Sequence, residues 1–362
     1  HQILEPEMID ATLPGPDSRN QRQEHSVADP ERARLLLQSI PDDPQTLSRL
    51  RGRHVLSARH FDAPLLRQLM RLAARYELGE LKGTHPLRCK VLSNLFLDRS
   101  HCTGRLSFSA AWMRLGGSLL DFERTVEQIL SRRYAVDEVI ELCNSYSDLT
   151  VLRTADAEML QDMLPRFRIP VINAGDGSGE HPTHAMADLY TLFKWRPALF
   201  QDDPPADQRL QIAVVGDPSR TRTIRSFLQL LACFPKAVER VVLLQRLEPG
   251  FAQGQREELE QSGLRVETTK ELFPMATDME IARELLPSID LLYMHQLQTV
   301  HLPRMQIIEG ISLFKPNAMV LNPEIQNEEA AHRLNDSPHN GYFAQARGSV
   351  FLRMAVFAAI LG

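Results

Sequence analysis

The sequence predicts an α/β protein made of two doubly wound, parallel-sheet domains with an N-terminal extension. Short apolar segments of strand length alternate with helical segments along most of the chain, which is the pattern of parallel sheets covered by helices on both faces. The alternation breaks at a proline- and aspartate-rich loop, Asp202 to Pro205, and then starts again. A length of 362 residues suits two domains of about 150 residues each. We expect the extension at 1–50, the first domain at 51–200 and the second at 206–345.

The extension is rich in proline and charged residues and contains one predicted helix, Glu31 to Ser39. Apolar periodicity then predicts alternating strands and helices in the first domain. These elements are a strand at His54–Ser57, a helix around 65–73, a strand at Val91–Leu97, helices at Ser107–Leu115 and Val136–Asn144, a strand at Leu149–Leu152, a buried strand from Val171 and a helix that opens at His181.

The second domain has the same predicted alternation of strands and helices. Its predicted strands are Leu210–Val215, Val241–Leu244, Leu291–Met294 and Ala318–Leu321, with a helix near Thr221 and an apolar final helix at Gly348–Leu361. The glycine after the first of these strands, Gly216, is not part of a GxGxxG fingerprint, so the sequence does not predict a dinucleotide site.

Composition excludes several classes of function. Hydrophobic residues make up 43% of the chain, charged residues 24%, and the formal net charge is −5, without the basic excess of nucleic-acid-binding proteins. No apolar run approaches the roughly 20 residues that span a bilayer, and the N-terminus lacks a signal-peptide pattern, so we expect a cytoplasmic protein without membrane contact. The four cysteines have no metal-ligand spacing and are expected to be reduced thiols.

Five blocks in order resemble the motifs of the aspartate carbamoyltransferase family, within the aspartate/ornithine carbamoyltransferase superfamily. The resemblance covers about residues 52–362. It implies a carbamoyltransferase-like fold, a homotrimer, and a last helix, 348–362, that returns to the first domain. The blocks are Arg105–Gly117 (like RLSFExxxxRLG), Val171–Tyr190 (like NAGDGxxxHPTQ), Val214–Ser226 (like VGDxxxGRTVHS), Asp290–Met294 (like DILYM) and Tyr342–Phe351 (like YFxQxxNGxFxR).

The resemblance implies a reaction in which an amino-acid amine attacks the carbonyl carbon of carbamoyl phosphate and phosphate leaves, with no metal or organic cofactor. Arg153 and His181 match catalytic positions of the family. The positions that match its substrate-binding residues are Ser100, Thr103, Arg105, His184, Arg222 and Gln298. Such residues would neutralise phosphate and stabilise an oxyanion.

Other positions depart from the family's pattern. In the phosphate loop, Ser100 to Arg105, His101 and Cys102 occupy the turn and the Arg that grips phosphate has no counterpart. Loss of one partner of a desolvated charge pair costs about 2–5 kcal/mol. On the acceptor side, a family Arg is replaced by Gln296 and a closing loop carries Glu324, so aspartate should be a poor ligand unless another cation reaches the site. The alternative interpretation is that Glu324 points to solvent.

A possible interface loop contains Arg132 and Arg133, where the family has a Lys that reaches a neighbouring site; a solvated basic pair is the alternative interpretation. His181 and His184 lie three residues apart at a helix start, but two histidines without a third ligand make a poor metal site, so no metal is expected.

Two hypotheses follow. In the first, slightly favoured, the protein is a non-catalytic homologue, structural or regulatory, that forms a homotrimer and binds another carbamoyltransferase or a regulatory subunit. In the second, it is a divergent carbamoyltransferase that binds carbamoyl phosphate and a small amino-acid-like acceptor other than aspartate. Changes in both substrate loops favour the first, and the retention of Arg153, His181 and Arg222 favours the second.

Overall fold

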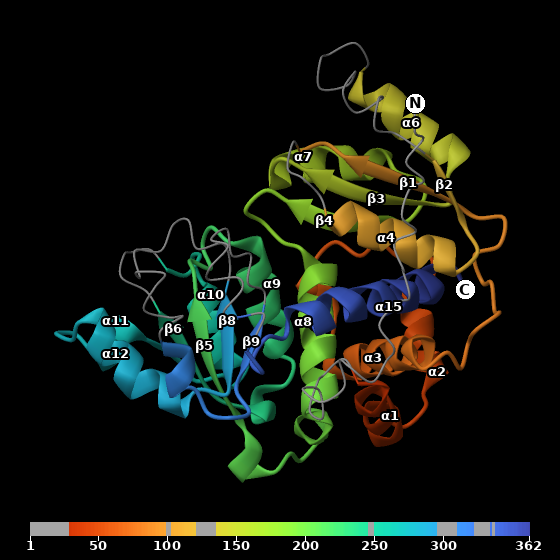
Figure 1. The fold of residues 1–362 in the computed structure, drawn as a ribbon. Coiled ribbons are helices and arrows are strands. Elements are labelled where there is room, and N and C mark those ends of the chain that lie inside the picture. Colours follow the sequence, from red (N-terminus) through yellow and green to blue (C-terminus); the bar gives the residue numbers. More distant parts are fainter. Residues whose placement is uncertain are drawn as a thin grey trace, which may run out of the picture.

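The strands form two parallel sheets in separate domains (Figure 1). The computed structural model describes residues 29–98, 103–120, 135–244, 250–294, 310–321, 334 and 337–362. The first sheet has the order β2-β1-β3-β4 and the second the order β7-β6-β5-β8-β9. Their bounds are β1 Val91–Phe96, β2 Ser118–Leu120, β3 Leu149–Thr154, β4 Val171–Asp176, β5 Leu210–Val215, β6 Val238–Leu244, β7 Val266–Thr268, β8 Leu291–Met294 and β9 Met319–Leu321.

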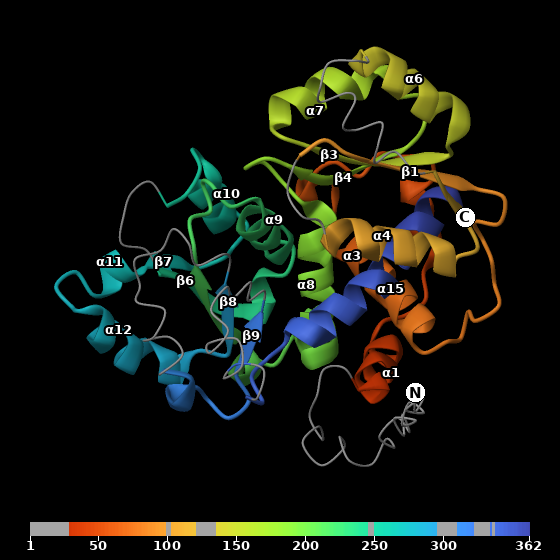
Figure 2. The same cartoon turned by 45° about the horizontal axis from the view of Figure 1, so that its top comes forward.

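Helices cover both faces of each sheet. Their bounds are α1 Pro30–Ser39, α2 Pro44–Leu47, α3 Ala63–Glu77, α4 Thr103–Arg114, α6 Val136–Tyr146, α7 Ala157–Met163, α8 Pro182–Trp195, α9 Arg222–Leu231, α10 Gln255–Gln261, α11 Thr269–Leu272, α12 Asp278–Leu285 and α15 Tyr342–Leu361. Helices α6 and α7 lie on one face of the first sheet, and α3, α4 and α15 on the other (Figures 1 and 2). In the second domain, α9 and α10 share a core with one face, while α12 packs on the opposite face.

The carboxyl ends of the first sheet's strands point toward the second domain, as the arrowheads in Figure 1 show. Strands β1 and β3 are paired in parallel, with Phe96 opposite Arg153. Strand β4 pairs with β3 through a register shift between Leu152 and Thr154. Because parallel strands end at the same edge, the residues that follow these three strands are brought together between the two domains.

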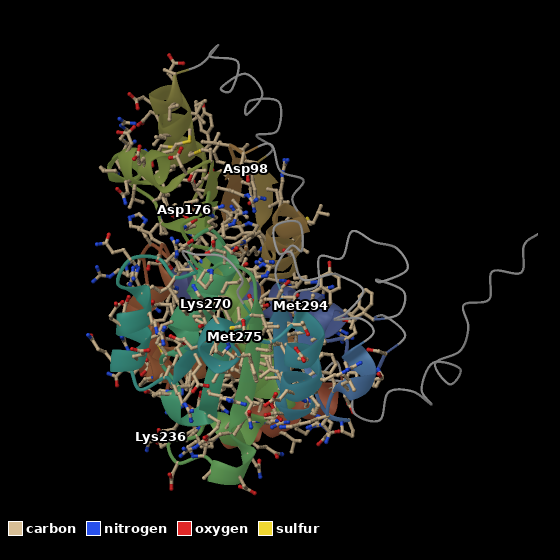
Figure 3. All side chains as sticks on the ribbon, turned by 90° about the vertical axis from the view of Figure 1, so that its left-hand side faces the viewer. Asp98, Asp176, Lys236, Lys270, Met275 and Met294 are labelled. Carbon is tan, nitrogen blue, oxygen red and sulfur yellow. The ribbon has the colours of Figure 1, made fainter. Side chains whose placement is uncertain are left out.

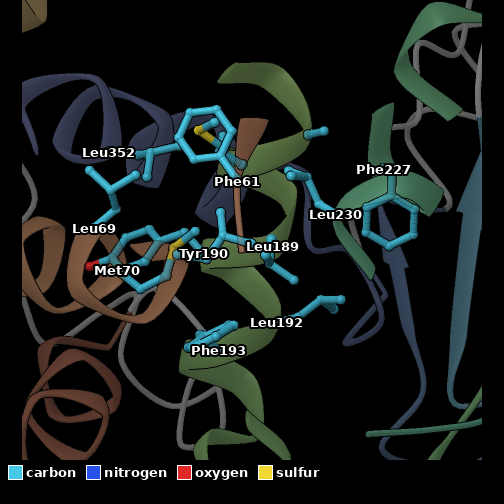
Figure 4. Packing of buried hydrophobic residues seen from close by; sticks show 14 of the residues in the cluster. Phe61, Leu69, Met70, Leu189, Tyr190, Leu192, Phe193, Phe227, Leu230 and Leu352 are labelled. Carbon is cyan, nitrogen blue, oxygen red and sulfur yellow. The ribbon is translucent and has the colours of Figure 1, made fainter. Parts of the chain in front are cut away.

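Helix α8 connects the domains and is buried almost completely. Twelve of its 14 residues are buried, and the two others are His184 and Trp195. On one side Tyr190 packs near α3, and on the other Leu189 and Leu192 face the α9 side chains, as Figure 4 shows. The largest apolar cluster therefore runs without a break from α1 through α8 to the second sheet. Because α8 is buried on nearly every side, its polar residues Asp188 and Lys194 bind partners inside the protein.

The first described helix belongs to this same core. The carboxylate of Asp29 caps α1 by accepting the Glu31 backbone N–H (2.9 Å). Ala33 and Leu36 are fully buried, and α1 contacts α3 and α8. Residues 29–50, which we assigned to the extension, are thus packed against the first domain rather than projecting from it.

Most predicted elements are confirmed, and the bounds of β5 and β8 are the predicted ones. The predicted strand at His54–Ser57 is wrong. Only Val55 pairs, in an isolated bridge to Ile172 beside β4. The chain then turns because Ser57 Oγ and the Ala58 N–H both donate to the Glu180 carboxylate (2.6 Å each), which ends strand pairing. The last helix begins at Tyr342 rather than at Gly348.

Helix α15 is long and apolar enough, by length and composition alone, to cross a membrane. Its apolar residues instead face the protein: 61% of its most apolar window is buried, and the helix packs against α3, α4 and α8. The Gly52 N–H also donates to the Ile360 carbonyl (2.9 Å), which fixes its last turn to the first domain. These contacts are those of a core helix.

An ion pair without solvent exposure joins α3 to α8. Lys194 Nζ donates to both carboxylate oxygens of Glu77 (3.0 and 2.9 Å), and the Tyr190 hydroxyl donates to the same carboxylate (2.6 Å). The side chains of Lys194 and Glu77 are both 0% exposed. Removal of one partner would leave the other as an uncompensated buried charge.

We therefore expect Lys194→Ala to lower the free energy of unfolding by about 3–5 kcal/mol. Urea denaturation followed by circular dichroism measures this change. Arg168→Ala is the matched control, because Arg168 pairs with Glu141 at the surface, where both side chains are more than half exposed and such pairs contribute little. Equal midpoints for Lys194→Ala and the control would contradict the assigned role of the buried pair.

Candidate functional site between the two domains

A partly buried ion pair stands at the carboxyl ends of β1 and β3. Arg153, near the end of β3, donates from Nε to Asp98 Oδ2 (2.6 Å), and the side chains are only 11% and 16% exposed. Asp98 follows β1 on the side of the first domain next to the second domain (Figure 3). The parallel register explains the pair, since the Leu97 N–H donates to the Arg153 carbonyl (2.8 Å).

The turn after β4 positions the start of α8. Gly175 and Gly177 have φ angles of 122° and 66°, values that favour glycine. A Cβ at Gly177 would lie 2.3 Å from the Ala155 carbonyl oxygen, so a side chain has no room there. Asp176 closes the turn by accepting the Glu180 N–H, and burial raises the pKa of this carboxyl. The turn delivers His181 to the first position before the helix.

His181 is a buried, neutral imidazole. It is 4% exposed, its backbone N–H donates to Ser226 Oγ of α9 (3.0 Å), and its Nδ1 has no hydrogen-bond partner among the described residues. Burial lowers the pKa of His181 well below its usual value, and the nearby His184, Arg222, Arg353 and Arg153 lower it further. Since the ring stays uncharged across the physiological range, it can act as a neutral hydrogen-bonding group.

Three guanidinium groups from three elements lie near enough to this histidine to lower its pKa. Arg153 comes from β3, Arg222 is the first residue of α9, and Arg353 lies in α15. Arg222 Nη1 donates to the Gly177 carbonyl (2.8 Å), which holds the side chain against the glycine turn. The gathering of positive charge around a neutral ring favours the binding of an anion at this place.

Arg353 is the most deeply buried of the three. It is 3% exposed, it donates to the Ser107 and Ser349 hydroxyls, and its guanidinium lies 4.2 Å from the centroid of the Phe108 ring. Burial lowers the pKa of Arg353 to about 10, against an opposing effect of Asp188. Arg353 therefore remains charged at neutral pH, and the packing of α15 against α4 holds that charge near His181.

The carboxyl group of Asp188 lies one helical turn after His184 on α8. Asp188 has no exposed surface; it accepts the Tyr293 hydroxyl of β8 (2.6 Å) and the Gln345 side-chain amide of α15. His184 Nε2 is 3.8 Å from Asp188 Oδ2. Burial raises the pKa of Asp188 to about 7, although the two hydrogen bonds and Arg353 oppose the rise. The carboxyl thus links α8, the second sheet and α15.

The structure brings together four of the residues singled out from the sequence: Arg153, His181, His184 and Arg222. Arg105 lies in the first turn of α4 and is partly buried, and Thr103 is the first residue of that helix. Several residues named above lie outside the described ranges or have no described side chain. They are Ser100, His101, Cys102, Arg132, Arg133, Gln296, Gln298 and Glu324, and the side chain of Thr103.

Sequence reasoning missed Asp98, Asp188, Gln345 and Arg353. A signal existed for Asp188, because it follows His181 by seven residues, which places both on one face of a helix. Asp98 directly follows an apolar strand, a position typical of site residues in parallel sheets. Gln345 and Arg353 stand at the Q and the last R of the motif YFxQxxNGxFxR quoted above, but no local pattern connects them to His181, because only the return of α15 brings them near α8.

The rings of His181 and His184 lie close together at the start of α8. Ring centroids of His181 and His184 are 5.3 Å apart. Among the residues that the structure describes, no group of three histidine, cysteine, aspartate or glutamate side chains could hold a metal ion.

Fold and site define a two-domain α/β protein in which arginines gather around a neutral histidine where parallel strands end. A family model described as "Aspartate/ornithine carbamoyltransferase, carbamoyl-P binding domain" matches residues 53–194. An aspartate carbamoyltransferase catalytic subunit from Thermococcus onnurineus is 30% identical over 328 residues, covering 86% of this chain and 98% of the relative. The corresponding subunit from Dichelobacter nodosus is 29% identical over 332 residues, covering 86% and 90%.

Solved structures of aspartate transcarbamoylase are also similar to this chain. Aspartate transcarbamoylase from Trypanosoma cruzi, in complex with aspartate and phosphate, superposes with a TM-score of 0.73 at 27% identity, covering 87% of this chain and 97% of the other. The same enzyme in complex with carbamoyl phosphate gives 0.72 at 27% identity, with the same coverage. The chain belongs to the aspartate/ornithine carbamoyltransferase family.

The raised pKa of Asp188 makes a prediction for stability. From about pH 4 to 7 the folded protein holds a proton on Asp188 that the unfolded chain, with a pKa near 3.8, has released. This stabilisation is complete below the unfolded pKa and is lost as the pH rises through about 7, with a slope of up to about 1.4 kcal/mol per pH unit. Asp188→Asn should remove that slope.

Unfolding free energies measured in urea between pH 5 and 8 test this expectation. Asp207→Asn, at an exposed carboxyl, is the control and should keep the wild-type slope. The same pH dependence in Asp188→Asn and wild-type protein would show that Asp188 does not titrate in this range.

Proposed function

We propose that the protein is a carbamoyltransferase that moves the carbamoyl group of carbamoyl phosphate to the amine of an amino acid. The observation that carries the proposal is the convergence of Arg153, Arg222 and Arg353 on neutral His181 between the domains. A doubly charged phosphate and a carbonyl oxygen that gains negative charge need such groups. The relatives that carry this fold are named as catalytic subunits of aspartate carbamoyltransferase, which supports the assignment.

In the proposed reaction, the amine nitrogen attacks the carbonyl carbon and forms a C–N bond. The carbon–oxygen bond to the phosphate group then breaks, phosphate leaves with the electron pair, and the amine proton passes to that phosphate. Arg153 neutralises the phosphate and the carbonyl oxygen, and His181 donates a hydrogen bond to that oxygen as negative charge develops. A neutral donor is suited to this step because it keeps its proton when the oxyanion collapses.

The acceptor is proposed to bind through its α-carboxylate to Arg222. Arg222 sits at the N-terminus of α9, where the helix adds further attraction for an anion. A carboxylate there would displace the contact between Arg222 and the Gly177 carbonyl. The relatives are named for aspartate, so aspartate is the first acceptor to test. Gln296 and Glu324 in the sequence favour a neutral or basic amino acid as the next.

A second candidate is a non-catalytic homologue that has a structural or regulatory role. The observation that favours it is in the sequence: His101 and Cys102 stand in the loop where the family's motif supplies a phosphate-gripping arginine. In that case the arginines around His181 would serve to bind a small anion without turnover, and another carbamoyltransferase would be the natural partner.

Product formation decides between the two candidates. Wild-type protein with carbamoyl phosphate should form the N-carbamoyl derivative of aspartate or of a neutral or basic amino acid, detected by mass spectrometry. His181→Ala should lower kcat by about 100- to 1,000-fold, the usual effect of removing one oxyanion donor. Arg168→Ala, at the surface far from the site, should leave kcat unchanged. No product from any of these acceptors would refute catalysis and favour the non-catalytic candidate.

We also propose that the chain forms a homotrimer in the cytoplasm and that its units run from 51–200, joined by 348–362, and from 206–345. An exposed apolar face on α4 supports self-association: Leu106 and Met113 are 71% and 55% exposed. A subunit contact on this face would remove both side chains from water.

Sedimentation equilibrium tests the trimer. Met113→Glu places a charge in the proposed contact and should shift the protein from trimer toward monomer. Tyr146→Glu is the control, because Tyr146 is 59% exposed on α6, away from α4. A monomeric wild-type protein, or a trimer that tolerates Met113→Glu, would rule out this contact.

A further inference from the structure

The guanidinium group of Arg225 bonds to two loops that follow strands of different sheets. Arg225 lies in the first turn of α9 and is partly buried. Its Nη1 donates to the Gly179 carbonyl (3.3 Å), in the turn after β4. Its Nη2 and Nε donate to the carbonyls of Ser219 (2.6 Å) and Pro218 (3.3 Å), in the loop after β5. This set of three bonds, the Arg225 clamp, joins the turn that carries His181 to the loop that leads into α9.

The Arg225 clamp requires an arginine. A guanidinium has five N–H donors in a planar fork, so it can serve three carbonyls at once. The motif VGDxxxGRTVHS, which residues 214–226 resemble, has a histidine at this position, and two ring nitrogens cannot donate to three carbonyls. Burial lowers the pKa of Arg225, while the carboxylates of Glu180 and Asp176 raise it. Since an arginine keeps its charge at neutral pH, the clamp is a set of charged hydrogen bonds between the two domains.

Arg222 contacts the same turn from one helical turn earlier on α9. Its Nη1 donates to the Gly177 carbonyl (2.8 Å), and a Cβ at Gly175 would lie 3.1 Å from its guanidinium carbon. An acceptor carboxylate on Arg222, as proposed above, would take the place of the Gly177 carbonyl. Arg225 would then still hold the start of α9 to the turn, because its bond to Gly179 does not involve Arg222.

The turn after β4 is also held within the first domain, independently of α9. The Gly177 N–H donates to the Thr154 carbonyl at the end of β3 (3.2 Å), and Asp176 accepts the Glu180 N–H. Loss of Arg225 would therefore free the start of α9 from the turn and leave the turn itself in place.

We infer that Arg225 is a positioning residue that keeps Arg222 at a set distance from His181 while Arg222 exchanges the Gly177 carbonyl for the carboxylate of the acceptor. The role in acceptor binding rests on the proposed function, whereas the clamp between the two loops does not. Arg225 contacts neither substrate in this role and acts through the placement of α9. Its loss should weaken binding of the acceptor and spare carbamoyl phosphate, whose proposed groups Arg153 and His181 are held by the first domain.

Hydrogen exchange measured by mass spectrometry tests the clamp without any substrate. In Arg225→Met, backbone amides at 217–225 should exchange about fivefold faster than in the wild-type protein, the value of one net hydrogen bond, while those at 171–180 keep their rates. Arg225→His, which introduces the residue of the motif, should behave in the same way. Arg265→Met is the matched control, because Arg265 pairs with Glu267 and its side chain is 62% exposed. Wild-type exchange rates at 217–225 in both Arg225 variants would disprove the clamp.

Steady-state kinetics test the positioning role. For an amino acid that the wild-type protein carbamoylates, Arg225→Met should raise KM about tenfold, the effect of losing one hydrogen bond to a charged group. Both kcat and the Kd of carbamoyl phosphate should change less than about threefold, whereas simple loss of folded protein would lower kcat at an unchanged KM.

Arg225→Lys separates the fork from the charge, because lysine keeps the charge and lacks the planar array of donors. It should leave KM raised. A wild-type KM in Arg225→Lys or in Arg225→Met would overturn the inference. If the wild-type protein forms no product with any acceptor, the proposed function fails and the role in acceptor binding fails with it, while hydrogen exchange still decides whether the clamp exists.

Discussion

The burial of helix α8 between the two domains is the constraint on which the rest of the structure depends. All but two of its residues are buried, and its neighbours come from α3, α9 and α15. Such a helix cannot tilt or shift without opening the core on both sides. The glycine turn that precedes α8 and the Glu77–Lys194 pair near its end hold it at both termini. His181, His184 and Asp188 are therefore fixed in space by packing before any ligand binds.

The burial of α8 also determines the electrostatics of the site. Burial removes water from His181 and Asp188, which lowers the pKa of the imidazole and raises that of the carboxyl. The arginines reach the same place from elements far apart in the sequence, and each is anchored by a carboxylate, a carbonyl or a hydroxyl group. Preorganised charge of this kind needs no rearrangement when an anion arrives, which is the physical basis of the proposed carbamoyl transfer.

Much of the fold and part of the site could be predicted from the sequence. Buried parallel strands are short apolar runs, so β5 and β8 were found with their bounds. The strand at His54–Ser57 failed because a distant carboxylate, Glu180, bonds to the turn that follows it, and no local pattern reports that contact. The family resemblance singled out Arg153 and His181, and the structure places them at the end of β3 and just before α8. Arg353 and Gln345 were missed because their proximity to α8 arises only from the packing of the last helix between the domains.

The central claim is that the arginines around His181 form a site for carbamoyl phosphate. Calorimetric titration of the protein with carbamoyl phosphate, with inorganic phosphate as the comparison, tests this claim most directly. The account predicts a micromolar dissociation constant for carbamoyl phosphate, at least about tenfold below that of inorganic phosphate, which corresponds to 1.4 kcal/mol. The absence of heat up to millimolar carbamoyl phosphate, or equal affinities for the two anions, would contradict it.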